Sequence, residues 1–139
     1  MKNFVIILII TLIFCSCKQK ITENDVAKIN GYWEIEKVDL PNGGKKQYKI
    51  NEAIDYFEIK NNKGFRKKVY PQLDGKYLVN DLIEKIVITH EKEEYFINYS
   101  TEYAKWKEQI LEIKDSTFVL KNKDDLEYHY KKQIPFSLK

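Results

Sequence analysis

Few side chains in this sequence have the type and spacing that catalysis requires. The two histidines, His90 and His129, fall in different predicted strands, and neither has a partner at the spacing of metal ligands. The serines lack a nucleophile-elbow signature, and no glycine-rich phosphate loop is present. Two pairs of adjacent carboxylates are explained more simply as solvated hairpin turns: Glu93-Glu94 and Asp124-Asp125. We therefore expect no enzymatic activity, no cofactor and no metal site.

The only two cysteines, Cys15 and Cys17, follow an apolar run near the start of the chain. This run covers residues 4–14, after Lys2, and is shorter than the roughly 20 residues that a bilayer-spanning helix needs. These features fit a secretory signal peptide. The small residue Ser16 directly before Cys17 resembles the lipobox of bacterial lipoproteins, whose cysteine is acylated and becomes the first residue of the mature chain. An uncleaved membrane anchor and an ordinary secretory peptide are the alternatives.

The lipoprotein resemblance implies three parts of the chain. These are a signal peptide over residues 1–16, a lipidated Cys17 with a polar tether to residue 29, and a folded domain over residues 30–139. Palmitate or similar acyl chains would hold the protein on a membrane, because each buried methylene contributes about 0.8 kcal/mol. We therefore expect a lipid-anchored protein of the bacterial cell envelope, either periplasmic or in the outer membrane. No thiol would remain for a disulfide, so packing alone must stabilise the domain.

The charge of the chain gives little indication of a charged partner. The formal net charge is +3, and loss of Lys2 with the signal peptide would make the mature chain nearly neutral. Two short basic runs, Arg66-Lys67-Lys68 and Gly44-Lys45-Lys46, are interspersed with acidic residues, which favours a solvated surface over a binding patch. We expect no nucleic-acid partner and a monomeric protein.

Residues 30–139 have the length of one ordinary domain and the pattern of an all-β fold. Short alternating segments are separated by turn signals such as Asn42-Gly43, Asn61-Asn62 and Asp74-Gly75. The segments predicted as strands cover residues 30–38, 54–60, 65–70, 77–79, 85–90, 94–99, 117–121 and 126–132. We predict a long loop over residues 41–52, and a helical turn at residues 25–28 that closes one end of the domain.

Residues 103–114 fit two kinds of structure. A helix would explain the spacing of four apolar residues: Tyr103, Trp106, Ile110 and Ile113. A strand would place Trp106 on one face together with the charged Glu108 and Glu112. The position of the segment among sequential hairpins favours the strand. We therefore predict an antiparallel up-and-down meander, closed into a barrel of eight or nine strands that has no exposed edge.

The first predicted strand opens with Gly31-Tyr32-Trp33, a Gly-x-Trp motif. In this position the motif resembles the lipocalin superfamily, and most closely the compact bacterial lipocalin-like lipoproteins. The resemblance covers residues 30–132 and implies that Trp33 closes one end of the barrel against a basic side chain, either Lys131 or Lys132, of which we choose Lys131. Thr101-Glu102-Tyr103, after the sixth predicted strand, is similar to the Thr-Asp-Tyr motif that the family carries between its sixth and seventh strands.

The resemblance also implies an apolar cup that holds one small ligand. By alternation Phe57 and Ile59 face together, as do Tyr128 and Tyr130, and these four residues are the predicted ligand contacts. The same large side chains could instead fill the barrel and leave no cavity. Two functions stay open. The first, which we favour, is a lipoprotein that binds a small apolar or amphipathic ligand. The second is a structural or interaction lipoprotein with a filled barrel that contacts a protein or glycan partner.

Overall fold

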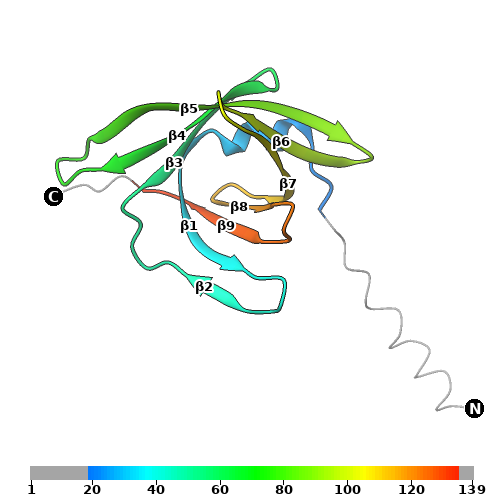
Figure 1. Cartoon of the computed structure of the whole chain (residues 1–139), viewed down its shortest axis with the longest axis horizontal. Helices are drawn as coiled ribbons and strands as arrows, with labels where there is room; N and C mark the ends of the chain where they lie inside the picture. Colours follow the sequence, from blue (N-terminus) through cyan, green and yellow to red (C-terminus); the bar gives the residue numbers. More distant parts are fainter. Residues whose placement is uncertain (1–18, 135–139) are drawn as a thin grey trace, which may run out of the picture.

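The computed structural model describes residues 19–134, so the predicted signal peptide and Cys17 lie outside the described residues. A short helical segment comes first, formed by α2 (Glu23–Val26) and the 3-10 turn η1 (Ala27–Ile29). Within the described residues nine strands follow: β1 (Gly31–Asp39), β2 (Lys45–Gln47), β3 (Ile54–Lys60), β4 (Lys63–Pro71), β5 (Tyr77–Glu91), β6 (Glu94–Ser100), β7 (Lys105–Ile113), β8 (Thr117–Lys121) and β9 (Glu127–Lys132). Figure 1 shows these strands following one another around a ring. No helix between residues 19 and 134 is long and apolar enough to span a membrane.

Antiparallel pairing closes eight of the strands into a barrel. From β3 to β9 each strand pairs with the next strand of the chain, while β1 pairs with β3 on one edge and with β9 on the other. We call the paired strands β1 and β9 the closing seam, which extends from Trp33 opposite Lys132 to Asp39 opposite Glu127. The additional strand β2 pairs with the last three residues of β1. The prediction of a closed antiparallel barrel is therefore confirmed.

Two segments differ from their predicted structure. The region expected to be a long loop, residues 41–52, contains β2, because the chain turns back at Gly43 and runs along β1. Residues 77–91 form one strand where two were expected. The polar pair Asn80-Asp81 interrupts the apolar pattern, but β4 and β5 pair on both sides of it across a register shift. As a consequence, the turn over residues 101–103 follows the fifth strand of the barrel, and the sequence-based count had placed it after the sixth.

The ambiguous segment is the strand β7, as its position among the hairpins predicted. It pairs with β6 on one side and with β8 on the other. Pairing on both edges outweighs the local helix propensity, which is a weak preference in a folded protein. A register shift between Ile110 and Glu112 also separates the two glutamates that alternation had placed together. Glu112 stays accessible and pairs with Lys114, whereas Glu108 is buried.

The helical segment and Trp33 pack together at one end of the barrel. A capping box begins α2, and Val26 and Ile29 are buried in the core. Trp33 is fully buried, and its indole Nε1 donates a hydrogen bond to the carbonyl oxygen of Ile29 over 2.6 Å. The indole packs edge-on against Phe118 with 4.6 Å between ring centroids. This end of the barrel is therefore a packed aromatic core.

The basic side chain beside Trp33 is Lys132, which corrects the choice of Lys131. The Lys132 ammonium lies 5.4 Å from the centroid of the Trp33 ring. Lys131 instead pairs with Glu34, with 3.2 Å between Nζ and Oε1. Directly opposed residues of an antiparallel pair share a face. Because Trp33 is opposite Lys132, its neighbour Lys131 must lie on the other side of the sheet.

We predict that Trp33→Ala lowers the free energy of unfolding by about 3–5 kcal/mol, the usual loss for a buried aromatic side chain. Urea unfolding followed by circular dichroism measures the change. The matched control is Trp106→Ala, because Trp106 is only partly buried and should cost much less. Equal losses for the two variants would contradict the closing role of Trp33.

Candidate functional site

A cavity of about 260 Å³ lies in the barrel, toward the end opposite Trp33. It borders the closing seam at Ile35 and Tyr128, which lie closer than Trp33 to the turn between β8 and β9. The complete wall consists of Ile35, Arg66, Lys68, Trp106, Glu108, Asn122, Tyr128 and Tyr130. The wall thus combines one aliphatic and three aromatic side chains with two cations, a carboxyl group and an amide.

Arg66 of β4 is the central cation of this wall. Its guanidinium carbon lies 4.4 Å from the centroid of the Tyr99 ring. Its Nε atom pairs with Glu84, and its Nη1 atom lies 3.7 Å from Oε1 of Glu108. A guanidinium over an aromatic face and between two carboxylates keeps its charge although it is largely buried. Arg66 thereby links β4 to β5, β6 and β7 across the interior.

Asp55 of β3 is a further charged residue that is buried in the barrel interior. It is 2 % exposed and accepts a hydrogen bond of 3.0 Å from the hydroxyl group of Tyr130. Its second oxygen pairs with the ammonium of Lys68. A carboxylate is tolerated at such depth only when it has partners of this kind. The two cations of the wall, Arg66 and Lys68, are therefore both already matched by carboxylates.

Burial changes the acid–base behaviour of the wall. Burial raises the pKa of Glu108 above its ordinary value, and Arg66 opposes this shift only in part. Burial likewise raises the pKa values of Tyr130 in the wall and of Tyr99, which packs on Arg66, well above the ordinary tyrosine value. A carboxyl group with a raised pKa keeps its proton to a higher pH, and in that form it both donates and accepts hydrogen bonds. Glu108 thus presents a buried carboxyl group to the cavity beside Arg66.

The predicted ligand contacts divide into two groups. Tyr128 and Tyr130 border the cavity. Phe57 and Ile59 do not border it, and both are buried in the core. Phe57 packs edge-on against Phe118 and Tyr130, with ring centroids 5.8 Å and 6.3 Å away. The stripe formed by Phe57 and Ile59 therefore fills the interior and does not line the cavity.

Sequence reasoning missed Arg66, Glu108 and Trp106 as parts of one wall. Arg66 belongs to a basic run that we assigned to the solvated surface, but β4 turns its side chain into the barrel. The sequence did contain a signal for Glu108, because alternation placed this charged residue on the same strand face as Trp106. In a barrel strand, such a residue indicates either a wet interior or a buried ion pair.

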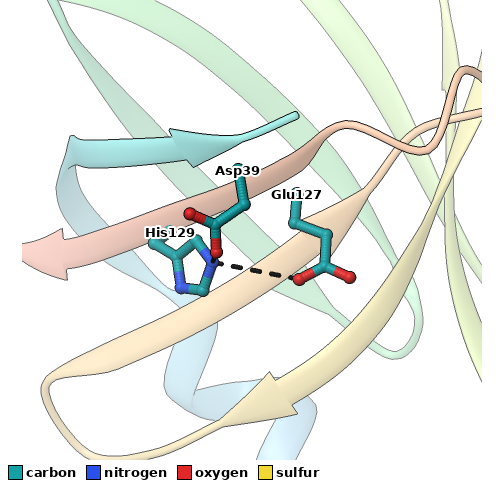
Figure 2. Close-up of side chains that lie close together, drawn as sticks. All are labelled: Asp39, Glu127 and His129. Carbon is teal, nitrogen blue, oxygen red and sulfur yellow. Dashed lines mark hydrogen bonds and ion pairs between the residues drawn. The ribbon is translucent and has the colours of Figure 1, made fainter. Parts of the chain in front are cut away.

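A second cluster lies outside the barrel, on the closing seam (Figure 2). Asp39, Glu127 and His129 each offer an atom that could hold a metal ion, and these atoms all lie within 4.8 Å of one another. Asp39 and His129 are 90 residues apart and make a contact of 2.8 Å. The expectation that neither histidine has a partner is therefore wrong for His129, because pairing of β1 with β9 brings the partners together.

A family model and one solved structure support a lipocalin-like fold. A family model described as a lipocalin-like domain matches residues 29–120. The chain is also similar to the crystal structure of a lipocalin-like protein from Bacteroides uniformis, with a TM-score of 0.51 and 12 % identity over 76 % of this chain and 99 % of that chain. A structure of an uncharacterized protein from Bacteroides eggerthii gives a TM-score of 0.47 and 12 % identity over 75 % of this chain and 98 % of that chain. No curated protein matches the sequence.

We predict that Glu108→Gln makes the free energy of unfolding less dependent on pH. The folded-state pKa of Glu108 is raised above the ordinary value of 4.5, so its contribution to stability is complete below that pH. The contribution is lost as the pH rises through the folded-state pKa. Glutamine stays neutral, so the variant should gain stability relative to the wild type at neutral pH and differ little in acid.

Urea unfolding in mildly acidic and neutral buffers measures this effect. Glu112→Gln is the matched control, because Glu112 lies on the same strand but remains accessible. It should leave the pH dependence unchanged. A parallel pH profile for the wild type and Glu108→Gln would contradict the raised pKa.

Proposed function

This chain belongs to the lipocalin-like domain family, and on that basis we propose that its barrel binds a small amphipathic molecule in the cavity beside Arg66. The observation that carries the proposal is the cavity of about 260 Å³, in a barrel whose other end is packed with aromatic side chains. Ligand sites in proteins are typically concave and mostly apolar, with a few polar groups that converge on the ligand. The cavity is concave and has converging polar groups, and half of its lining residues are charged or carry an amide.

The composition of the wall favours an amphipathic ligand over a purely apolar one. Ile35, Trp106 and Tyr128 offer an apolar and aromatic surface, while Glu108 and Arg66 present polar atoms to the same space. A purely apolar ligand would cover these polar atoms without giving them partners, which costs free energy. Because the cations of the wall are already paired with carboxylates, a ligand with neutral hydroxyl, carbonyl or amide groups fits better than a strongly charged one.

Binding is proposed in preference to catalysis. The described residues that form the wall include no serine, cysteine or histidine, which are the side chains that most often act as nucleophile or proton carrier in enzymes. The proposed role is therefore to hold or carry a small molecule, in a protein that we expect to act as a monomer.

We predict that Ile35→Trp fills part of the cavity and weakens binding of the neutral amphipathic dye Prodan at least about tenfold, or 1.4 kcal/mol. The wild type should bind one dye molecule and shift its emission to shorter wavelength. Glu34→Trp is the matched control, because Glu34 pairs with Lys131 on the outer face and its replacement should not affect the dye.

Native mass spectrometry of the purified full chain provides an independent measurement, with one co-purified small molecule as the expected result. Equal dye binding by both tryptophan variants would contradict this site. A wild-type protein that neither carries a molecule nor binds the dye would favour the alternative function, an interaction protein whose surface contacts a protein or glycan.

The proposal includes export and anchoring through an acylated Cys17. The apolar run at residues 4–14 and the Ser16-Cys17 pair support it. Only four residues separate Cys17 from Thr22, the N-cap of α2, and they span at most about 14 Å when fully extended. Because α2 leads directly into the closed end of the barrel, an anchored barrel would hold that end near the membrane and direct the cavity away from it.

We predict that Cys17→Ala abolishes metabolic labelling with palmitate and releases the protein from the membrane fraction. The physical reason is that the acyl chains supply the membrane affinity. Cys15→Ala is the matched control and should remain labelled and membrane-bound. Retention of unlabelled Cys17→Ala on the membrane would support an uncleaved anchor and contradict acylation.

A further inference from the structure

The closing seam places three metal-ligating side chains on the outer face of the barrel. Asp39 of β1 lies directly opposite Glu127 of β9, and His129 follows two positions along β9. Opposed residues and residues two apart in a strand share one face of a sheet. Tyr128 and Tyr130 occupy the other, inward face of β9, where they border the cavity. Figure 2 shows the three outer side chains converging on one point.

The geometry points to a binding site for a divalent transition-metal ion, with zinc as the first example, formed by Asp39, Glu127 and His129. Nε2 of His129 lies 2.8 Å from Oδ2 of Asp39 and 4.0 Å from Oε2 of Glu127. Ligand atoms that surround zinc at about 2.0–2.2 Å in a tetrahedron are roughly 3.3–3.6 Å from one another. Small side-chain rotations therefore bring all three atoms into the zinc coordination sphere.

The ligand types select the class of ion. Calcium and magnesium take oxygen ligands, whereas an imidazole nitrogen with carboxylate oxygens suits zinc and its neighbours in the first transition row. Two carboxylates also balance the charge of a divalent ion. A set of three protein ligands leaves at least one coordination position for water or a further ligand.

A cation, the ammonium group of Lys37, already lies beside Asp39. Nζ of Lys37 lies 3.3 Å from Oδ2 of Asp39, and the other oxygen, Oδ1, is buried without a hydrogen-bond partner among the described residues. Lys37 thus occupies part of the space of a metal ion, and its flexible side chain can withdraw to solvent.

The surface beside the cluster has room for the open coordination position. A groove of about 410 Å³ is bordered by Asp39, Glu127 and Asp125, together with Lys121 of β8. Water molecules can reach an ion there, and Asp125 lies on the same groove as a further carboxylate. Three half-buried protein ligands beside an open groove are the arrangement expected for an exchangeable ion.

An ion bound here would join β1 to β9 directly. Because its ligands come together only when the barrel is closed, binding would favour the folded state over the unfolded state. Such an ion would not contact a molecule in the cavity, which lies on the inner face of the same strands. The site therefore adds a second ligand to the protein and does not rest on the proposed function.

The test uses the full chain in detergent, with any polyhistidine tag removed, and zinc chloride alone as the probe. Calorimetric titration should show one ion per chain, and zinc should raise the thermal unfolding midpoint. His129→Ala should weaken binding by at least roughly 100-fold, more than the loss of a supporting group. His90→Ala is the matched control and should bind zinc as the wild type does, because His90 stacks on Tyr95 outside the cluster.

A second variant tests the site with all three ligands in place. Lys37→Met removes the competing ammonium, so it should bind zinc more tightly than the wild type. Cobalt(II) should give the visible absorption bands of a tetrahedral site in this variant and in the wild type. The proposal is overturned if the wild type shows no saturable zinc binding, if the two histidine variants lose affinity equally, or if Lys37→Met binds no more tightly.

Discussion

Antiparallel pairing between β1 and β9 joins the two ends of the sheet, and the other structural features depend on it. Without this pairing both strands would present unpaired backbone groups along an exposed edge. With it, Trp33 is opposite Lys132 and its indole is enclosed between the helical segment and Phe118. A register shift between Ile35 and Lys37 lets the seam continue to the turn between β8 and β9. One set of backbone hydrogen bonds thus closes the barrel and fixes which side chains of β1 and β9 face inward and which face outward.

The interior of the barrel has two physically different halves. Aromatic and aliphatic side chains fill the half near Trp33, where burial of apolar surface stabilises the fold. The other half contains Arg66 and Glu108, which face each other. Asp55 lies opposite Trp33 and pairs with Lys68. Desolvation of these charged groups is costly, and their partners offset that cost. A sequence selected for stability alone could fill this half with apolar side chains. Charged groups around a cavity, with a raised pKa at Glu108, are more typical of a binding site.

The cavity wall and the outer cluster share the strand β9. Tyr128, in the cavity wall, lies between Glu127 and His129 in the outer cluster, so neighbouring residues of one strand serve both places. Successive residues of a strand point to opposite faces of the sheet, so a shift of the β9 backbone moves the side chains on both faces together. An ion that fixes β9 against β1 would therefore also limit the freedom of the wall at Tyr128. The two proposed ligands are separate in chemistry but share one structural support.

Local pattern in the sequence was enough to predict the all-β class, most of the strands, the hairpin turns and the position of Trp33 at the start of the barrel. These features depend on alternation and turn residues, which act between neighbours along the chain. Only the tertiary structure decided that residues 77–91 form one strand, that Lys132 meets Trp33, that Arg66 faces Glu108, and that Asp39 meets His129. Each of these outcomes depends on strand register, and a shift of one residue moves every following side chain to the opposite face. Register is set by pairing between distant segments and by bulges, which alternation along a single strand does not reveal.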